Sequence, residues 1–288
     1  MRVEIFDVEH GQCAMVHCPP NGKKLLIDAG HKTNNWWPSV HFLGQPIELA
    51  IITNFDEDHA SDIANVREAC TIKGIHYNTS INAARLRQMK ALSGMGPGIQ
   101  HIHDWLQSRE TLWGGGLVNI DLGHVSARSY CNTYGTAPGQ FTDANNLSVA
   151  TFVTYSNFTI FFPGDLEGAG WRQIMQQPGF MQDLARTTVL VASHHGRDNG
   201  CCEELFENWS PRAVIISDAG MQHATQETVN WYANRTSGCQ TNTGVNRKVF
   251  TTRSDGKITI DVSADRWGIL TSPTPITRNA LLDFLGAQ

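Results

Sequence analysis

Short apolar runs, separated by glycine, proline, asparagine and aspartate, dominate the chain. Three such runs open the sequence and predict strands over 3–8, 13–18 and 23–30. The Pro-Pro-Asn-Gly segment at 19–22 predicts a hairpin turn between the second and third strands. The next run, 47–53, is apolar and β-branched, which predicts a buried strand.

Helical spacing appears after the polar segment 54–59 that follows this strand. In segment 61–70 the apolar residues Ile63, Val66 and Ala69 or Cys70 recur every three to four positions, which places them on one face of a helix. Further segments with helical composition or spacing follow at 81–92, 101–110, 201–209 and 227–235. Helices are therefore expected between the strands along most of the chain.

The second half of the chain alternates further strands with these helices. Strands are predicted over 117–122, 124–130, 187–192 and 212–217. The run 147–165 predicts a hairpin that turns near Ser156 and Asn157. Near the end, a turn at 254–256 separates the predicted strands 248–253 and 257–262.

The sequence predicts one domain. Neither a low-complexity linker nor a repeat of fixed period divides the chain. We therefore expect a single α/β domain over 1–288, with two sheets and interleaved helices. The last twelve residues predict a short amphipathic helix, forming an extension from about 275 that packs on the domain or serves a partner.

Composition and charge narrow the possible functions. The chain has 288 residues, of which 41% are hydrophobic and 17% charged, as in folded soluble proteins. Its net charge of -5 and scattered basic residues exclude the basic stripe of proteins that wrap duplex DNA by charge alone. A nucleic-acid substrate stays compatible with this charge, because a metal ion can hold phosphate locally.

The sequence also predicts the compartment. The N-terminal residues carry acids and lack the apolar core of a signal peptide, and no apolar stretch of about 18 residues occurs, so no membrane contact is expected. Seven cysteines without zinc-knuckle spacing predict reduced thiols in a cytoplasmic protein.

Three polar clusters each follow a predicted strand directly. The first is the Asn-Phe-Asp-Glu-Asp-His segment at 54–59, the second contains Asp165, and the third contains His194 and His195. Because the carboxyl ends of strands in α/β sheets face one crevice, these clusters are expected to converge. Converging histidines and aspartates form a site of mixed nitrogen and oxygen ligands, which suits Zn or Mn.

Each cluster has a simpler interpretation when taken alone. The acidic segment can cap the following helix through Asp58 or Ser61, and a histidine pair in a loop is often polar surface. An EF-hand fails on spacing, because Ser61 and Arg67 stand where such a loop requires glycine and glutamate. The coincidence of all three clusters at strand ends favours a metal site.

Taken together, these segments resemble the metallo-β-lactamase-fold hydrolases, and most closely their ComEC-like branch, known from DNA-uptake channels. The resemblance covers about residues 2 to 262, and it implies a four-layer αββα sandwich with two mixed sheets and a metal site at one edge. The segments that carry it are "FDVEHGQCAMV", "LLIDAG", "TNFDEDHASD", "NNLSVATFVTYSNFTIFFPGDLE", "VLVASHHG" and "PRAVIISDAGMQHATQETVNWY".

The resemblance assigns metal-ligand roles to individual residues. The family motif His-x-His-x-Asp-His falls on Asn54, Asp56, Asp58 and His59, so the first histidine is replaced by asparagine, which departs from the branch. Asp165 matches the bridging carboxylate of the family. His194 or His195 matches its late histidine ligand, and Asn145 and Asn146 stand where other branches have a further histidine.

These assignments predict two unequal metal sub-sites. Asp58, His59, Asp165 and one of the two adjacent histidines supply four ligands, enough for one firm ion. The second sub-site would have Asp56, the shared Asp165 and the amide oxygens of Asn54 and Asn145 or Asn146. Amide oxygens bind hard cations and are poor zinc ligands. The second ion is therefore expected to be weak, to prefer Mn or to depend on substrate.

Residues around the metal site receive supporting roles. Asp28 is expected to orient a ligand histidine. His223 is expected to assist the leaving group or bind phosphate, the alternative being a helix cap, and Arg197 is a candidate phosphate clamp or a surface arginine. Asp7 and His10 are weaker candidates for lining the pocket. The pair at 36–37, Trp-Trp, forms either a stacking platform or part of the core.

The resemblance implies a metal-dependent hydrolase that cleaves a phosphodiester in a nucleic acid or nucleotide, with Asp58 or Asp165 orienting the attacking water and His223 assisting. The acidic charge favours a short substrate over long duplex DNA. A protein partner in a larger system is a separate expectation, and one alternative function is a binding or regulatory module with a weakened metal site. Another is a hydrolase of thioesters or lactones. The oligomeric state stays open.

Overall fold

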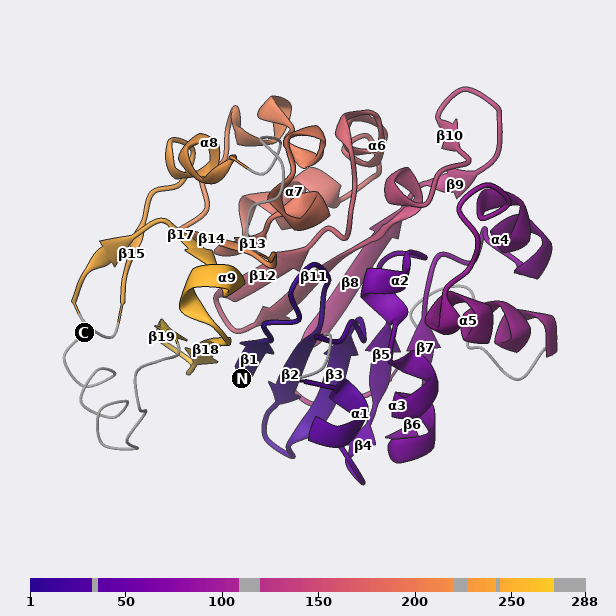
Figure 1. The fold of residues 1–288 in the computed structure, drawn as a ribbon. Helices are drawn as coiled ribbons and strands as arrows, with labels where there is room; N and C mark the ends of the chain where they lie inside the picture. Colours follow the sequence, from indigo (N-terminus) through magenta and orange to yellow (C-terminus); the bar gives the residue numbers. More distant parts are fainter. Residues whose placement is uncertain (33–35, 109–119, 220–226, 242–243, 272–288) are drawn as a thin grey trace.

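The computed structural model describes residues 1–32, 36–108, 120–219, 227–241 and 244–271 (Figure 1). His223 and the predicted C-terminal helix lie outside the described residues. Within these ranges no helix has both the length and the apolar character needed to cross a membrane. All seven cysteines are free thiols.

The first sheet has seven strands in the order β19-β18-β1-β2-β3-β5-β7. The strands from β19 to β3 pair antiparallel, whereas β3, β5 and β7 pair parallel, so the sheet is mixed. Its strands are β1 (Arg2–Ile5), β2 (Ala14–Cys18), β3 (Lys23–Ile27), β5 (Leu49–Ile51), β7 (Ile75–His76), β18 (Ile258–Val262) and β19 (Trp267–Thr271).

The second sheet has six strands in the order β17-β14-β13-β12-β11-β8, and it is mixed as well. The predicted hairpin is β11 and β12, which turn at Ser156 with a positive φ of 53°. The strands are β8 (Ser126–Cys131), β11 (Val149–Tyr155), β12 (Phe158–Phe162), β13 (Val189–Val191), β14 (Ala213–Ile216) and β17 (Val249–Thr251).

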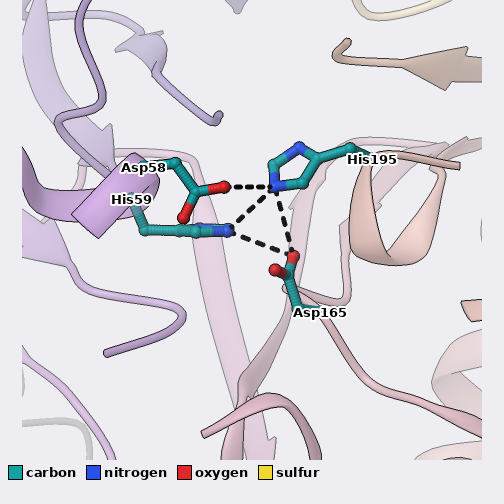
Figure 2. Close-up of side chains that lie close together, drawn as sticks. All are labelled: Asp58, His59, Asp165 and His195. Carbon is teal, nitrogen blue, oxygen red and sulfur yellow. Dashed lines mark hydrogen bonds and ion pairs between the residues drawn. The ribbon is translucent and has the colours of Figure 1, made fainter. Parts of the chain in front are cut away.

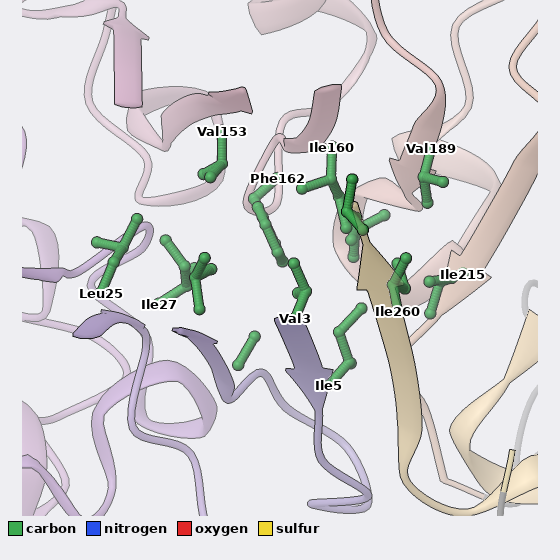
Figure 3. Packing of buried hydrophobic residues seen from close by; sticks show 14 of the residues in the cluster. Val3, Ile5, Leu25, Ile27, Val153, Ile160, Phe162, Val189, Ile215 and Ile260 are labelled. Carbon is green, nitrogen blue, oxygen red and sulfur yellow. The ribbon is translucent and has the colours of Figure 1, made fainter. Parts of the chain in front are cut away.

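A shared apolar core lies between the two sheets (Figure 3). Side chains alternate along each strand, so one face of every sheet enters this core and the other face turns outward. In β12, Ile160 and Phe162 face the first sheet, whereas Phe161 packs in the outer layer. In β2, Val16 faces the shared core and Met15 faces outward. Continuously apolar strands therefore have partners on both faces.

Helices cover both outward faces and complete four layers (Figure 1). The first sheet is covered by α1 (Pro38–His41), α2 (Glu57–Ala60), α3 (Ile63–Ala69), α4 (Ala83–Met89) and α5 (Pro97–Ser108). The second sheet is covered by α6 (Gly168–Ile174), α7 (Phe180–Ala185) and α8 (Val229–Ala233). The predicted αββα arrangement with two mixed sheets is confirmed.

Short elements complete the described chain. The helices are α9 (Thr252–Asp255), η1 (Asn145–Leu147), η2 (Ser193–Gly196), η3 (Asp198–Gly200) and η4 (Glu203–Phe206). The strands of two residues are β4 (Pro46–Ile47), β6 (Thr71–Ile72), β9 (Thr133–Tyr134), β10 (Gln140–Phe141), β15 (Cys239–Gln240) and β16 (Asn246–Arg247).

Three sequence predictions were wrong in part. The turn at 254–256 does not form a hairpin, because β17 joins the second sheet and β18 the first, with α9 carrying the chain between them. Of the strand predicted over 117–122, residues 120–122 have no strand pairing. Segment 201–209 contains one 3₁₀ turn instead of a longer helix. Alternation and spacing cannot show which sheet a strand joins.

Candidate metal centre

Four side chains from three separate segments converge on one point (Figure 2). They are Asp58, His59, Asp165 and His195, here called the quartet, and one ligand atom of each lies within 4.8 Å of the others. The Nε2 atom of His59 is 3.1 Å from Asp165 Oδ1, and the Nε2 atom of His195 is 3.2 Å from Asp58 Oδ2. Two nitrogens and two carboxylate oxygens facing one centre match the ligand chemistry of Zn²⁺.

The strands of both sheets bring the quartet together. Asp58 and His59 lie in α2, which follows β5 of the first sheet. Asp165 and His195 follow β12 and β13 of the second sheet. Gly164 has a φ of +64°, and a Cβ there would lie 2.8 Å from Ser148 Cβ, so the turn into Asp165 requires glycine. The predicted convergence of strand ends is thus observed.

Both quartet histidines are oriented by hydrogen bonds to their Nδ1 atoms, which point away from the centre. The Nδ1 atom of His59 is 2.8 Å from Asp28 Oδ2, and the same carboxylate accepts hydrogen bonds from the backbone and hydroxyl of Thr53. The Nδ1 atom of His195 donates to the carbonyl of Ser217 at 2.9 Å. These contacts hold the Nδ1 protons and leave both Nε2 atoms facing the centre. Asp28 lies where its expected orienting role requires.

The side chains of the quartet shift one another's pKa values. Burial alone would raise the pKa of the Asp165 carboxyl, but the neighbouring His59 and His195 outweigh it and lower that pKa. Burial acts against Asp58 in the same way, and the hydrogen bond from His195 with the charge of His59 lowers its pKa to about 2. The carboxylates in turn raise the pKa of both histidines despite burial. The carboxylates therefore favour protonated His59 and His195 rings, and a divalent cation bound at the centre would take the place of those Nε2 protons.

The backbone decides which histidine of the pair joins the quartet. His194 and His195 both have left-handed backbone angles, with φ values of 50° and 54°. Such angles are uncommon for residues with a side chain and persist only where the surroundings enforce them. They turn His195 into the quartet, whereas the Nδ1 atom of His194 lies 3.5 Å from Glu167 Oε1.

Asp56 does not join the quartet. Its carboxylate forms an ion pair with the ammonium of Lys90, a buried residue at the C-terminal end of α4. The structure pairs Asp56 with Lys90, and the role of Asp56 as a ligand of a second ion stays a prediction. Lys90 follows Asp56 by 34 residues, and no local pattern connects the two.

The asparagines of the predicted second sub-site form a chain of hydrogen bonds that ends at Glu167. Asn145 donates through Nδ2 to Glu167 Oε1 at 3.0 Å, so its own amide oxygen accepts from Asn54 Nδ2 at 3.1 Å. This order leaves Asn54 Oδ1 buried without a hydrogen-bond partner in the described structure. Asn146 Oδ1 accepts hydrogen bonds from the backbone N–H groups of Glu167 and Gly170 at the start of α6, and its role as a metal ligand stays a prediction.

Sequence reasoning missed several residues around the centre. Glu167 lies two residues after Asp165, and this proximity is the only feature of the sequence that indicates a place near the centre. Glu57, in the acidic segment, accepts hydrogen bonds from the backbone of Gly98 and Ile99 and so caps α5, which is distant in sequence. The N-cap residue of its own helix, Asp56, makes no side-chain cap bond.

Of the remaining predicted residues, His10 and Arg197 lie beside the quartet, whereas Trp36 and Trp37 make their contacts with other aromatic residues. The Nη2 atom of Arg197 donates to His10 Nε2 at 2.8 Å, and the His10 ring lies 4.6 Å from the His195 ring. Burial, and then the charge of His195, lowers the pKa of His10 to about 4. Trp36 stacks on Phe6 in the outer core, whereas Trp37 is exposed and stacks on His31.

Comparison with known proteins supports the fold and leaves the activity open. No protein-family model matches the chain, and no curated protein matches its sequence. Among solved structures, CmlA from Streptomyces venezuelae, a diiron β-hydroxylase, aligns with a TM-score of 0.54 and 12% identity. The alignment covers 90% of this chain and 54% of CmlA, so the chain spans about half of that protein.

Two further structures align over most of both chains. Zn²⁺-bound PqqB from Methylobacterium extorquens aligns over 91% of this chain and 100% of its own, with 12% identity and a TM-score of 0.49. A protein from Thermotoga maritima assigned as a zinc-dependent hydrolase of the metallo-β-lactamase superfamily aligns over 86% and 97%, with 9% identity and a TM-score of 0.41. The chain itself has an αββα architecture with two mixed sheets, and its candidate metal centre lies where strands of both sheets end.

Proposed function

We propose that the chain is a metal-dependent hydrolase that cleaves a phosphodiester in a nucleic acid or a nucleotide. The observation that carries this proposal is the quartet itself, with both imidazole Nε2 atoms directed at one centre by Asp28 and by the Ser217 carbonyl. So many buried polar groups are costly unless a ligand compensates them. The donor set fits a divalent ion, which would be held by Asp58, His59, Asp165 and His195.

The quartet members differ in access to solvent, and this difference separates their roles. A bound divalent ion supplies Lewis-acid activation of water and of the substrate. Asp58 has 28% of its side chain exposed, whereas the other three have 1% to 5%. With a pKa lowered to about 2, Asp58 is ionised at neutral pH and can accept a hydrogen bond from the attacking water. Asp165 is the buried carboxylate that would hold the ion. The predicted assistance of His223 to the leaving group belongs to the same proposal.

The proposed cofactor is Zn or Mn, with one firm ion in the quartet and a weaker second ion. Because Asp56 pairs with Lys90, the second ion would rely on the free amide oxygen of Asn54 and on Glu167 beside His194. Oxygen ligands favour a hard cation such as Mn²⁺ over Zn²⁺.

The resemblance to the ComEC-like branch supports the choice of a phosphodiester, and the net charge of -5 favours a short substrate. The fold does not decide the reaction, since CmlA uses it in a diiron β-hydroxylase. A cytoplasmic location and a protein partner in a larger system remain expectations that accompany the proposal.

The test combines metal analysis with phosphodiesterase assays. Purified protein is analysed for bound zinc, manganese and iron, and then assayed on bis-p-nitrophenyl phosphate, single-stranded DNA and duplex DNA with added Zn or Mn. We expect about one tightly bound ion per chain and metal-dependent cleavage that Asp58→Ala and His59→Ala abolish. Asp104→Ala, at an exposed position of α5, is the matched control. Equal background rates in all four proteins would contradict the hydrolase proposal.

A second candidate function is a binding or regulatory module with a weakened metal site. The substitution of the first motif histidine by Asn54 and the pairing of Asp56 with Lys90 favour it. The variant Asn54→His tests whether Asn54 is a degraded ligand, since its metal content should rise towards two ions per chain. Metal binding without hydrolysis in both proteins would favour the module.

A further inference from the structure

Arg197 lies beside the metal centre without an acidic partner. It follows the His-His-Gly segment, and its Nη2 atom donates to the imidazole of His10. Among the described residues no carboxylate forms an ion pair with it, and its Nε atom is buried with no hydrogen-bond partner. Two other partly buried arginines, Arg247 and Arg253, are each neutralised by an aspartate. The positive charge of Arg197 is therefore available to bind an anionic ligand.

His10 is fixed to the quartet through its own loop. The carbonyl of Gly11 accepts a hydrogen bond from Ser217 Oγ at 2.7 Å, and the backbone of Gln12 donates to the carbonyl of Asp58 at 3.2 Å. A Cβ on Gly11 would lie 2.5 Å from that Asp58 carbonyl, so only glycine permits this close approach. The loop that carries His10 is thus hydrogen-bonded to Ser217 and Asp58, the two residues that also contact the His195 ring.

The hydrogen bond between Arg197 and His10 orients the guanidinium without neutralising it. A guanidinium can only donate, so His10 Nε2 accepts, and the ring is neutral with its proton on Nδ1. A carboxylate in the place of His10 would hold Arg197 equally well but would cancel its charge. The neutral imidazole keeps that charge available beside the quartet.

We propose that Arg197 binds a non-bridging oxygen of an anionic phosphoryl group at the metal centre, and that His10 is the positioning residue that holds Arg197 there. This inference rests on the proposed hydrolase function and narrows its substrate class. A phosphodiester carries a negative charge before it reacts, whereas a thioester or lactone does not. The pair therefore selects phosphodiesters over neutral esters, and the planar guanidinium suits phosphate oxygens better than an ammonium does.

The kinetic test compares a charged and a neutral substrate. Wild-type protein, Arg197→Gln, Arg197→Lys, His10→Leu and His10→Gln are assayed on bis-p-nitrophenyl phosphate and on p-nitrophenyl acetate. Arg197→Gln should lower kcat/KM for the diester by about 10- to 100-fold and change that for the acetate by less than about twofold, because only the diester offers a charge. His10→Leu should lower the diester value mainly through KM, and His10→Gln should restore part of it, since its amide oxygen can accept from Arg197.

A matched control removes one positive charge elsewhere. Arg172→Gln changes an exposed arginine of α6 that pairs with Glu204, and it should leave both substrates unaffected. Equal losses on the diester and the acetate in Arg197→Gln would overturn the proposal. A loss on neither substrate would overturn it as well.

A binding measurement separates failure of this proposal from failure of the hydrolase function. Inorganic phosphate is titrated into the zinc-loaded protein by calorimetry, with bound zinc measured in parallel. Arg197→Gln should weaken phosphate binding by about tenfold or more at unchanged zinc content. If the protein hydrolyses none of the substrates but phosphate binding still depends on Arg197, the anion site stands and the hydrolase function fails. Equal phosphate affinity in wild type and Arg197→Gln overturns the anion site whatever the activity.

Discussion

The quartet and the residues of the predicted second metal sub-site differ in how many of their buried polar atoms have hydrogen-bond partners. In the quartet each imidazole has a partner on Nδ1 and directs Nε2 at the centre. On the other side, Asn54 Oδ1 and His194 Nδ1 are buried without hydrogen-bond partners in the described structure. The Glu167 carboxylate accepts a hydrogen bond from the Asn145 amide and so sets its orientation. The Asp56 carboxylate forms an ion pair with Lys90. Position in a motif therefore does not make a residue a ligand; its remaining hydrogen bonds decide.

The largest contrast is expected between the two adjacent histidines. His195→Ala should lower zinc affinity by more than about 100-fold, because it removes a direct ligand and even indirect partners cost about 10- to 100-fold. His194→Ala should retain the tight ion, since its ring faces Glu167. Zinc content after dialysis against a chelator measures both. Retention of zinc by His195→Ala with loss in His194→Ala would reverse the assignment.

A smaller effect is expected from the carboxylate behind the quartet. Asp28→Asn should lower zinc affinity by about 10- to 100-fold, because the amide holds the His59 ring less firmly and lowers its basicity. A competitive titration with a zinc-binding dye provides the measurement. Thr53→Val, which removes one hydroxyl donor to the same carboxylate, should have a smaller effect. Unchanged zinc affinity in Asp28→Asn would refute the orienting role.

The quartet should also make stability depend on pH when metal is removed. The pKa values of His59 and His195 are raised above 6.5, so the stability they contribute is complete below that value and is lost as pH rises through their folded pKa values. The chelated protein should therefore have a lower Tm at pH 9 than at pH 6. The increase in Tm given by zinc should grow over the same range, because zinc binds the deprotonated rings.

Calorimetric scans with and without zinc measure both trends. On the acid side, the lowered pKa of Asp58 contributes stability above its ordinary value near 3.8, and that contribution is lost as pH falls towards 2. The variant His195→Gln should show a weaker decline of Tm between pH 6 and pH 9. A chelated wild-type protein whose Tm rises over that interval would be incompatible with the raised histidine pKa values.

The smallest effect is expected at Lys90. Lys90→Met removes the partner of Asp56, whose side chain is 38% exposed and therefore regains water, so the cost in unfolding free energy should be about 1 kcal/mol or less. Freed from its ion pair, Asp56 should bind Mn²⁺ more tightly at the weak side of the centre. Electron paramagnetic resonance of added Mn²⁺ tests this against Lys24→Met, a distant control. Equal Mn²⁺ binding in both variants would show that Asp56 does not reach the ion.

The sequence by itself determined the fold class and most of the quartet. Apolar runs of strand length predicted buried strands, and the polar clusters after three of these runs directed Asp58, His59 and Asp165 towards one edge. These features are local, because the period of a strand and the residue after it are written in adjacent positions.

Only the tertiary structure decided which of the candidate residues share the centre. The left-handed backbone at 194–195 selected His195, and the distant Lys90 withdrew Asp56. Crossing between sheets, not pairing in a hairpin, separated β17 from β18. The pairing of His10 with Arg197 joins residues 187 positions apart. Each of these depends on contacts between segments distant in sequence, and no periodicity or spacing along the chain encodes such contacts.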